Sequence, residues 1–195
     1  MVITTNAYMG ILVALAAERV FELVWSRRNA RRLLSMSAVE IGNAHFPAMV
    51  MFHTAFIGAA AAEAVWLDRP FPGILGWAAL CGAIAAQALR YWSVATLGIR
   101  WNTRIIVLPD VAPVTRGPYR FMRHPNYLAV VVELACIPLI HGCWMTAIVF
   151  SAGNAVLLRV RIRAEEKALG AVYARTLGAK PRFFRSPRGP SERSA

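Results

Sequence analysis

Five apolar segments dominate the sequence, and their length is the strongest constraint on how the chain folds. They cover residues 7–26, 46–66, 73–93, 127–141 and 143–160. A helix needs about 20 apolar residues to cross the hydrocarbon of a bilayer. Because 57% of the 195 residues are hydrophobic and only 16% are charged, the chain is too apolar for an ordinary soluble domain. We therefore predict an all-α integral membrane bundle of about five transmembrane helices.

The last two apolar segments are short, and only His141 and Gly142 separate them. This spacing predicts a C-terminal helical hairpin whose second helix continues past residue 160 into the aqueous phase. Within one overall domain, we expect transmembrane helices in 1–93, and a catalytic loop, the hairpin and a cytoplasmic helix in 94–178. We expect the basic segment 179–195 to be a flexible tail.

Basic residues are distributed unevenly between the connections, which predicts the orientation. Four arginines lie in 27–45, five lie in 94–126, and nine lysines or arginines follow from 161 onward. On the other side, 67–72 holds one arginine and the hairpin turn none. Cytoplasmic loops carry the excess of Lys and Arg. We therefore expect an N-terminus outside and a C-terminus inside, in the inner (plasma) membrane of a bacterium.

The net charge of +12 does not indicate a nucleic-acid partner, because the basic residues lie between apolar segments and form no stripe on a soluble fold. Cys81, Cys136 and Cys143 lie in or beside apolar runs without C-x-x-C spacing. We interpret them as packing residues, and we expect no metal site.

Charged residues inside the apolar segments are costly in a membrane and need partners. Glu18, Arg19 and Glu22 lie within about one helical turn of each other. Two interpretations are open: a structural cluster that fixes the helix, or the lining of a substrate entrance. The same alternatives hold for Glu133, and for His53 the structural interpretation is favoured.

The first motif, G-P-Y-R-F-M-R-H-P-N-Y, covers residues 117–127 and ends where the fourth apolar segment begins. Pro125 suits the first turn of a helix and favours an extended conformation for His124. His124 would then project beside the free N–H groups of a helix start, a corner suited to anionic groups. The alternative is a helix entry with interfacial arginine and tyrosine anchors.

The second motif, R-I-R-A-E-E, covers residues 161–166. Arg161 and Glu165 are neighbours on a helix, as are Arg163 and Glu166. Because exposed ion pairs on helices contribute only about 0.3–0.5 kcal/mol each, stability is a weak reason for this arrangement. Two carboxylates beside several arginines suit a ligand that carries both charges and hydroxyl groups.

Together, G-P-Y-R-x-x-R-H-P-x-Y, a short apolar hairpin and R-x-x-x-E-E resemble the isoprenylcysteine carboxyl methyltransferase family, to which the phospholipid methyltransferases are related. The similarity covers about residues 90–178, including Leu97, Gly98 and Trp101. The chain looks most like the shorter bacterial members. The resemblance implies an S-adenosylmethionine site on the cytoplasmic side and a lipophilic substrate that enters from the bilayer.

The resemblance also implies roles for individual residues, although the division of roles among Arg161, Arg163, Glu165 and Glu166 stays open. Arg161 and Glu165 fall where the family positions the methyl acceptor, so they are the expected catalytic residues. We expect acceptor contacts from Trp101, Asn102 and Thr103. The expected cofactor-binding residues are Tyr119, Arg123, His124, Pro125, Tyr127, Leu128, Arg163 and Glu166.

Three functions compete at this point. The first is S-adenosylmethionine-dependent methyl transfer to a carboxylate or hydroxyl oxygen of a lipophilic molecule. The second is an NADPH-dependent membrane reductase of the sterol or steroid type, because that class shares R-H-P-N-Y and Asn126 stands in its place. The third is a non-enzymatic membrane scaffold whose basic loops bind anionic lipid. The Glu165–Glu166 pair favours methyl transfer over both alternatives.

Overall fold

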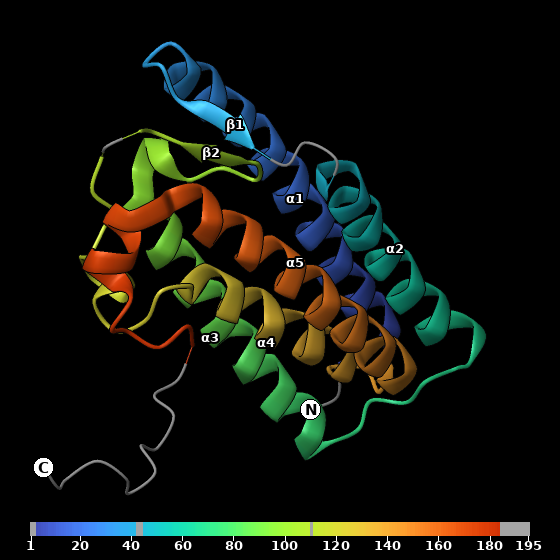
Figure 1. The fold of residues 1–195 in the computed structure, drawn as a ribbon. Coiled ribbons are helices and arrows are strands. Elements are labelled where there is room, and N and C mark those ends of the chain that lie inside the picture. Colours follow the sequence, from blue (N-terminus) through green and yellow to red (C-terminus); the bar gives the residue numbers. More distant parts are fainter. Residues whose placement is uncertain (1–2, 42–44, 110, 184–195) are drawn as a thin grey trace, which may run out of the picture.

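Five α-helices lie side by side and form the body of the protein (Figure 1). The structure is a computed structural model that describes residues 3–41, 45–109 and 111–183. Three of the five helices are long and apolar enough to cross a membrane, as expected of a membrane protein. The elements are α1 Thr5–Leu34, β1 Val39–Ile41, α2 His45–Trp66, α3 Ile74–Leu97, the short helices η1 Gly98–Arg100 and η2 Gly117–Arg120, β2 Ile105–Val107, α4 Pro125–Leu139 and α5 Trp144–Leu177.

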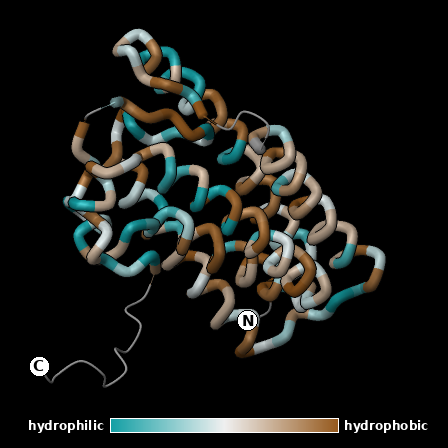
Figure 2. The backbone as a smooth tube through the Cα atoms, in the orientation of Figure 1, coloured by the Kyte–Doolittle hydropathy of each residue, from teal (hydrophilic) through white to brown (hydrophobic). Residues whose placement is uncertain are grey.

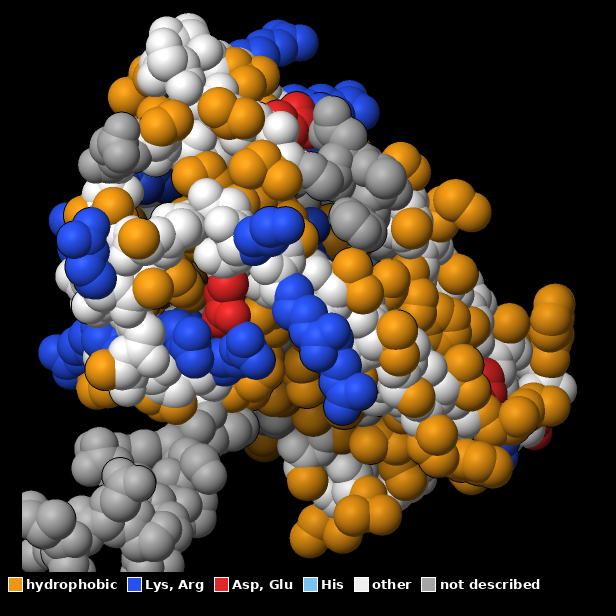
Figure 3. Space-filling model, in the orientation of Figure 1, with side chains coloured by type: hydrophobic (Ala, Val, Ile, Leu, Met, Phe, Trp, Pro, Cys, Tyr) orange, Lys and Arg blue, Asp and Glu red, His pale blue; other side chains and the backbone are white. Residues whose placement is uncertain are grey.

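The closest packing in the bundle joins α3 to α4, with α5 on the other side of α4. Gly82 allows this approach, because a Cβ atom at that position would lie 2.7 Å from the Cys136 sulfur. Large apolar side chains such as Trp66, Ile74 and Met51 stay exposed. Figure 3 shows this apolar surface over the α2 side of the molecule, whereas Lys and Arg gather toward the end that holds the sheet. Such a division suits a protein that is surrounded by lipid over part of its height.

The polar end differs from the prediction in two respects (Figure 2). First, α1 continues to Leu34, where we expected a linker from residue 27. Arginine is a good helix former, and Arg27, Arg28, Arg31 and Arg32 extend the helix with exposed side chains. Second, β1 pairs antiparallel with β2, so the all-α bundle also carries a small two-stranded sheet. The strands are three residues each and distant in sequence, so no periodic pattern indicates them.

Beyond its apolar part, α5 bends sharply at Gly170, which has φ 63° and ψ −155°. Glycine adopts this conformation without a steric penalty. The last turns of α5 therefore fold back toward the start of α4 (Figure 1). Residues 180–182 then lie against that start, because the Arg123 N–H donates to the Pro181 carbonyl over 2.9 Å. Part of the segment that we expected to be a flexible tail is thus bound to the bundle, and residues 184–195 lie outside the described residues.

Candidate functional site

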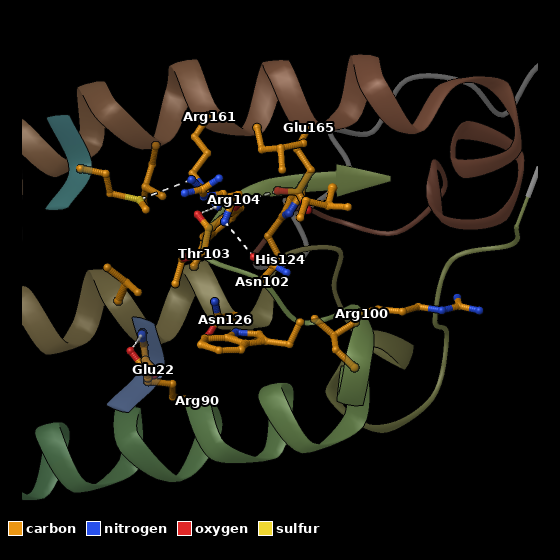
Figure 4. A pocket seen from close by; sticks show the side chains of 18 of the residues that line it. Glu22, Arg90, Arg100, Asn102, Thr103, Arg104, His124, Asn126, Arg161 and Glu165 are labelled. Atoms are coloured by element: carbon orange, nitrogen blue, oxygen red, sulfur yellow. Dashed lines mark hydrogen bonds and ion pairs between the residues drawn. The ribbon is translucent and has the colours of Figure 1, made fainter. Parts of the chain in front are cut away.

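A cavity of about 760 Å³ lies between α1, α2, α4, α5 and the loop around β2. Both sequence motifs reach it, although they are far apart in the chain. Figure 4 shows Arg161 and Glu165 extending from α5 toward the loop, with His124 beneath them. On another wall, Glu22 and Arg90 face each other from α1 and α3. The cavity therefore has polar groups on two sides and apolar side chains between them.

Tyr127 links the two predicted catalytic residues. Its hydroxyl accepts a hydrogen bond from Arg161 Nε over 2.8 Å and donates one to Glu165 Oε2 over 2.5 Å. Arg161 is fixed further by the Thr103 carbonyl, which accepts from its Nη2 over 2.6 Å, and by contact with Met49. One helical turn separates Arg161 from Glu165, so both point to the same side of α5. This arrangement holds a guanidinium group, a phenol and a carboxylate in fixed order at one end of the cavity.

Glu166, about 100° further around α5, forms a second cluster. Its carboxylate accepts from Arg123 Nη1 over 3.2 Å, lies 3.1 Å from His124 Nε2, and accepts two bonds from Arg182, over 3.1 Å and 2.6 Å. His124 is buried and stacks on Tyr127, with the ring centres 5.3 Å apart. The His124–Tyr127 stack thus connects the Glu166 cluster to the cavity.

Residues 180–182 cover the segment that precedes α4, whereas the N–H groups of Asn126 and Tyr127 in its first turn have no partner among the described residues. The His124 N–H donates to the Arg182 carbonyl over 3.1 Å, and that of Arg123 is bonded to Pro181. Lys180 extends the same contact, since its ammonium group donates to the Tyr119 carbonyl over 3.0 Å. We call residues 180–182 the strap, because they cover this segment from outside. The strap thus lies beside the expected anion-binding corner at the start of α4, and that corner stays a prediction.

The loop that carries the predicted acceptor contacts is bound to α1. Ser26 donates to the Asn102 side-chain oxygen over 2.6 Å and accepts from the Thr103 N–H over 3.0 Å. Asn29 donates to the Trp101 carbonyl over 2.9 Å. The loop is consequently rigid, and its three residues Trp101, Asn102 and Thr103 line the cavity.

Most of the predicted site residues meet at the cavity, but four do not. Pro125 is buried in the first turn of α4, Leu128 lies off the lining, and Glu166 belongs to the cluster with the strap. Arg163 is exposed, because two residues rotate a helix by about 200° and place it opposite Arg161. The residues that line the cavity are Trp101, Asn102, Thr103, Tyr119, Arg123, His124, Tyr127, Arg161 and Glu165.

Burial raises the pKa of the Tyr119 phenol well above its ordinary value. The nearby charge of Glu165 acts in the same direction. Tyr119 therefore remains a neutral hydroxyl at physiological pH, and it presents a hydrogen-bond donor to the cavity.

Several lining residues escaped the sequence reasoning. Asn154 lies seven residues before Arg161, which is two helical turns and the same face of α5. From that spacing, Asn154 could have been predicted as a residue on the same wall as Arg161. Tyr173 lies 3.4 Å from His124 Nε2, but the break at Gly170 removes any simple periodic relation to Glu165. Arg90 gave no signal beyond being the one charged residue in the third apolar segment.

Five charged residues inside the bundle form one network across three helices. Arg90 binds Glu22 through two nitrogens, over 2.7 Å and 2.6 Å. Arg19 binds Glu22 over 2.6 Å and both Glu18 and Glu133 over 3.2 Å. The network joins α1, α3 and α4, and its residues Arg19, Glu22 and Arg90 also line the cavity. The network thus links the helices, as the structural interpretation requires, and a role in substrate entry stays a prediction. His53, for which we favoured a structural role, also lines the cavity.

Comparison with known proteins agrees with this arrangement. The family model for the isoprenylcysteine carboxyl methyltransferase (ICMT) family matches residues 77–171, a stretch that contains both motifs and the hairpin. The chain belongs to the isoprenylcysteine carboxyl methyltransferase family. The ICMT match begins in α3 and ends just past the bend in α5, so it includes the start of α4 and the polar face of α5.

Two bacterial relatives are similar over nearly their whole length. The uncharacterized protein YpbQ of Bacillus subtilis is 39% identical over 160 residues, which are 82% of this chain and 94% of YpbQ. An uncharacterized protein of Haemophilus influenzae is 28% identical over 163 residues, 82% of this chain and 93% of the relative. These relatives do not narrow the ICMT-family assignment to one reaction.

A solved structure, that of the eukaryotic intramembrane Ras methyltransferase ICMT, is similar with a TM-score of 0.48 and 22% sequence identity. The similar part covers 63% of this chain and 45% of that chain. The present chain thus spans less than half of the solved enzyme. The details of the site described above come from this chain's own residues.

Proposed function

We propose that this protein is an integral-membrane, S-adenosylmethionine-dependent methyltransferase that methylates a carboxylate or hydroxyl oxygen of a lipophilic acceptor. The observation that carries the proposal is the Arg161–Tyr127–Glu165 chain, which joins the two family motifs at one wall of the cavity. When bound, S-adenosylmethionine supplies a methyl group activated by a positively charged sulfur. Transfer of that group requires alignment and exclusion of water more than proton chemistry.

The residues near His124 fit such a cofactor. Arg123 Nε is a buried donor without a partner in the described part of the chain, and it stands beside the cavity, where it suits a carboxylate. Glu165 suits a cationic group or ribose hydroxyls, and the stacked rings of His124 and Tyr127 offer a flat surface. Glu166 would hold the opposite side of this corner through His124 and Arg123.

The acceptor would approach Arg161 from the apolar part of the cavity. A guanidinium group binds a carboxylate or phenolate well and would hold its oxygen in place for attack. If the acceptor is a hydroxyl, Glu165 is the base at hand, because its carboxylate is within the same hydrogen-bonded chain. Apolar walls from Val20, Ile57 and Leu157 would exclude water around the reacting oxygen.

The proposal includes a topology. We infer five crossings, with α1 and α4 added to the three long apolar helices. The strap, the sheet and the site would face the cytoplasm, where S-adenosylmethionine is made, and lipid would border the apolar walls. The sign of the loop charges supports this orientation.

The decisive experiment is titration of S-adenosylmethionine into purified protein in lipid nanodiscs. Saturable binding is expected, and Glu165→Gln should weaken it at least tenfold, because a charge-assisted contact is lost. Arg163→Ala is the matched control on the same helix, and its affinity should stay within about twofold of the parent because its side chain points away from the cavity.

NADPH titrated under the same conditions separates the reductase alternative. Stabilisation by NADPH without stabilisation by S-adenosylmethionine would contradict the proposal and favour a reductase. Binding of neither cofactor would favour a lipid-binding scaffold.

A further inference from the structure

The wall of the cavity opposite Arg161 carries a second polar group that the proposed reaction does not use. Arg90 is 6% exposed, lies on α3 and is held by both oxygens of Glu22. Figure 4 shows this pair well apart from Arg161 and Glu165, across the space that the loop and α4 border. A charged pair at this place in an apolar bundle is costly. Stability alone is a poor reason for it to line a cavity.

Buried polar atoms without partners are concentrated around this space. Arg90 Nη1 is buried and makes no hydrogen bond with any described residue, and the same holds for Asn102 Nδ2 and Asn126 Oδ1. All three residues line the cavity. A buried donor or acceptor without a partner costs about 1–3 kcal/mol. Arg19 Nε and Arg123 Nε, on the same lining, are also without a partner among the described residues, and together these five atoms indicate that a ligand with oxygen functions completes them.

The charge of the network selects the kind of ligand group. It contains the carboxylates of Glu18, Glu22 and Glu133 and the guanidinium groups of Arg19 and Arg90, which gives a formal charge of −1. This negative charge would repel an anionic ligand group. An uncharged oxygen can accept from the free N–H of Arg90 without such repulsion. Arg90 is thus better suited to a hydroxyl or carbonyl oxygen than to a carboxylate.

His53 and Asn154 distinguish between a hydroxyl and a carbonyl as the ligand group. The Met49 carbonyl lies 2.9 Å from His53 Nδ1 and can only accept, so Nδ1 carries a proton and the neutral ring keeps Nε2 as an acceptor. His53 lines the same cavity, as does Asn154, whose amide both donates and accepts. A hydroxyl group uses both kinds of partner, and a carbonyl uses only donors.

We infer that Arg90, oriented by Glu22, determines specificity by binding an uncharged hydroxyl of the acceptor at a second polar subsite. This inference rests on the proposed function, because it assigns the chemistry of the acceptor in the same cavity. Asn154 and Arg161 are seven residues apart on α5, so polar groups along the α5 wall are separated by about 10 Å. The acceptor is accordingly a lipophile with a hydroxyl at a distance from its methylated oxygen.

The test uses the full chain in nanodiscs loaded with S-adenosylhomocysteine. The probes are dodecanoic acid and a series of monohydroxydodecanoic acids with the hydroxyl at successive positions, and binding is measured by calorimetry. At least one position is expected to bind roughly tenfold or more tightly than dodecanoic acid, as a hydrogen bond to a charged donor provides. In Arg90→Lys this preference should fall roughly tenfold, because the lysine ammonium lacks the planar fork that binds both oxygens of Glu22 and still leaves Nη1 free.

Arg69→Lys is the control. Arg69 forms an ion pair of 3.2 Å with Glu63, and neither residue lines the cavity. The hydroxyl preference of Arg69→Lys should equal that of the parent. If Arg90→Lys does not fold, the double variant Glu22→Met/Arg90→Met replaces the pair by apolar groups of similar length and should lose the preference in the same way.

The inference is overturned if no position binds better than dodecanoic acid, or if the preference survives in Arg90→Lys. S-adenosylmethionine binding, measured separately, distinguishes the two claims. Cofactor binding without a hydroxyl preference overturns the second subsite alone, whereas a hydroxyl preference without cofactor binding keeps the subsite and rejects the methyltransferase.

Discussion

The molecule holds two clusters of ion pairs that differ in how firmly their partners are fixed. The Glu22–Arg90 pair is enclosed by helices, with side chains 9% and 7% exposed. The Glu166–Arg182 pair lies at the cytoplasmic end in the proposed topology, and Arg182 is 50% exposed. Water and salt can replace the partners of the second pair but reach the first poorly. The Glu22–Arg90 pair therefore stabilises the helix bundle, whereas the partners of Glu166 can be replaced by a ligand.

The same difference appears in the connections of the two clusters. Arg19 links the inner pair to Glu133 of α4, so three helices share one network. The outer pair instead joins α5 to the strap, which is held by backbone hydrogen bonds to Arg123 and His124. We expect the strap to respond to ligand binding and the inner network to remain unchanged.

The largest effect on stability is expected from Glu22→Ala. This change leaves Arg90 buried without its carboxylate and removes the shortest bond of Arg19. Loss of one partner of a buried ion pair costs about 3–5 kcal/mol. Thermal unfolding in detergent should show a large fall in Tm or no cooperative transition.

Glu40→Ala is the control for that change, because Glu40 pairs with Arg104, whose side chain is 37% exposed. Glu40→Ala should lower the free energy of unfolding by less than about 1 kcal/mol. Equal shifts in Glu22→Ala and Glu40→Ala would show that the inner network is no more important to stability than a surface pair.

An intermediate effect is expected from Tyr127→Phe, which removes the hydroxyl between Arg161 and Glu165. Both groups lose their fixed positions while the ring still stacks on His124. Methyl transfer should slow by roughly tenfold to hundredfold, since small errors of alignment have effects of this size. Single-turnover rates with labelled S-adenosylmethionine measure it, and Tyr91→Phe, an exposed tyrosine of α3, should leave the rate unchanged. A normal rate in Tyr127→Phe would remove this chain of contacts from the mechanism.

The smallest effect is expected from Arg182→Ala. Because Arg182 is half exposed, loss of its pair with Glu166 should cost less than about 1 kcal/mol, and the difference from the parent should shrink further in high salt. Tm values at low and high sodium chloride measure both effects. A fall as large as that of Glu22→Ala would mean that the strap is part of the structural core, and the distinction between the two clusters would be lost.

The sequence predicted the helices well because hydrophobic length is a local property. All five expected segments are helical, and the hairpin turn falls at His141 and Gly142 as expected. Helix geometry also explains why Arg161 and Glu165 lie together on the cavity wall. The same geometry places Arg163 on the opposite side, and adding it to the expected cofactor residues overlooked this rotation.

What the sequence could not supply depends on contacts between distant segments. The β1–β2 pairing, the Arg90–Glu22 bond and the strap each join residues far apart in the chain, with no periodic signal in either partner. Arg182 looked like one more charge in a basic tail, and only its position against Glu166 distinguishes it.

The length of α4 has a consequence for how the protein is made. Its 15 residues extend about 22 Å, which is less than the hydrocarbon thickness of about 30 Å. Such a segment is a poor signal for the insertion machinery when it emerges alone from the ribosome. Because the turn to α5 is tight and the first residues of α5 are bound to Glu63 of α2, we expect α4 and α5 to insert as one unit after α2 is in place. The two family motifs, at the start of α4 and on α5, would then reach the cavity in the same step.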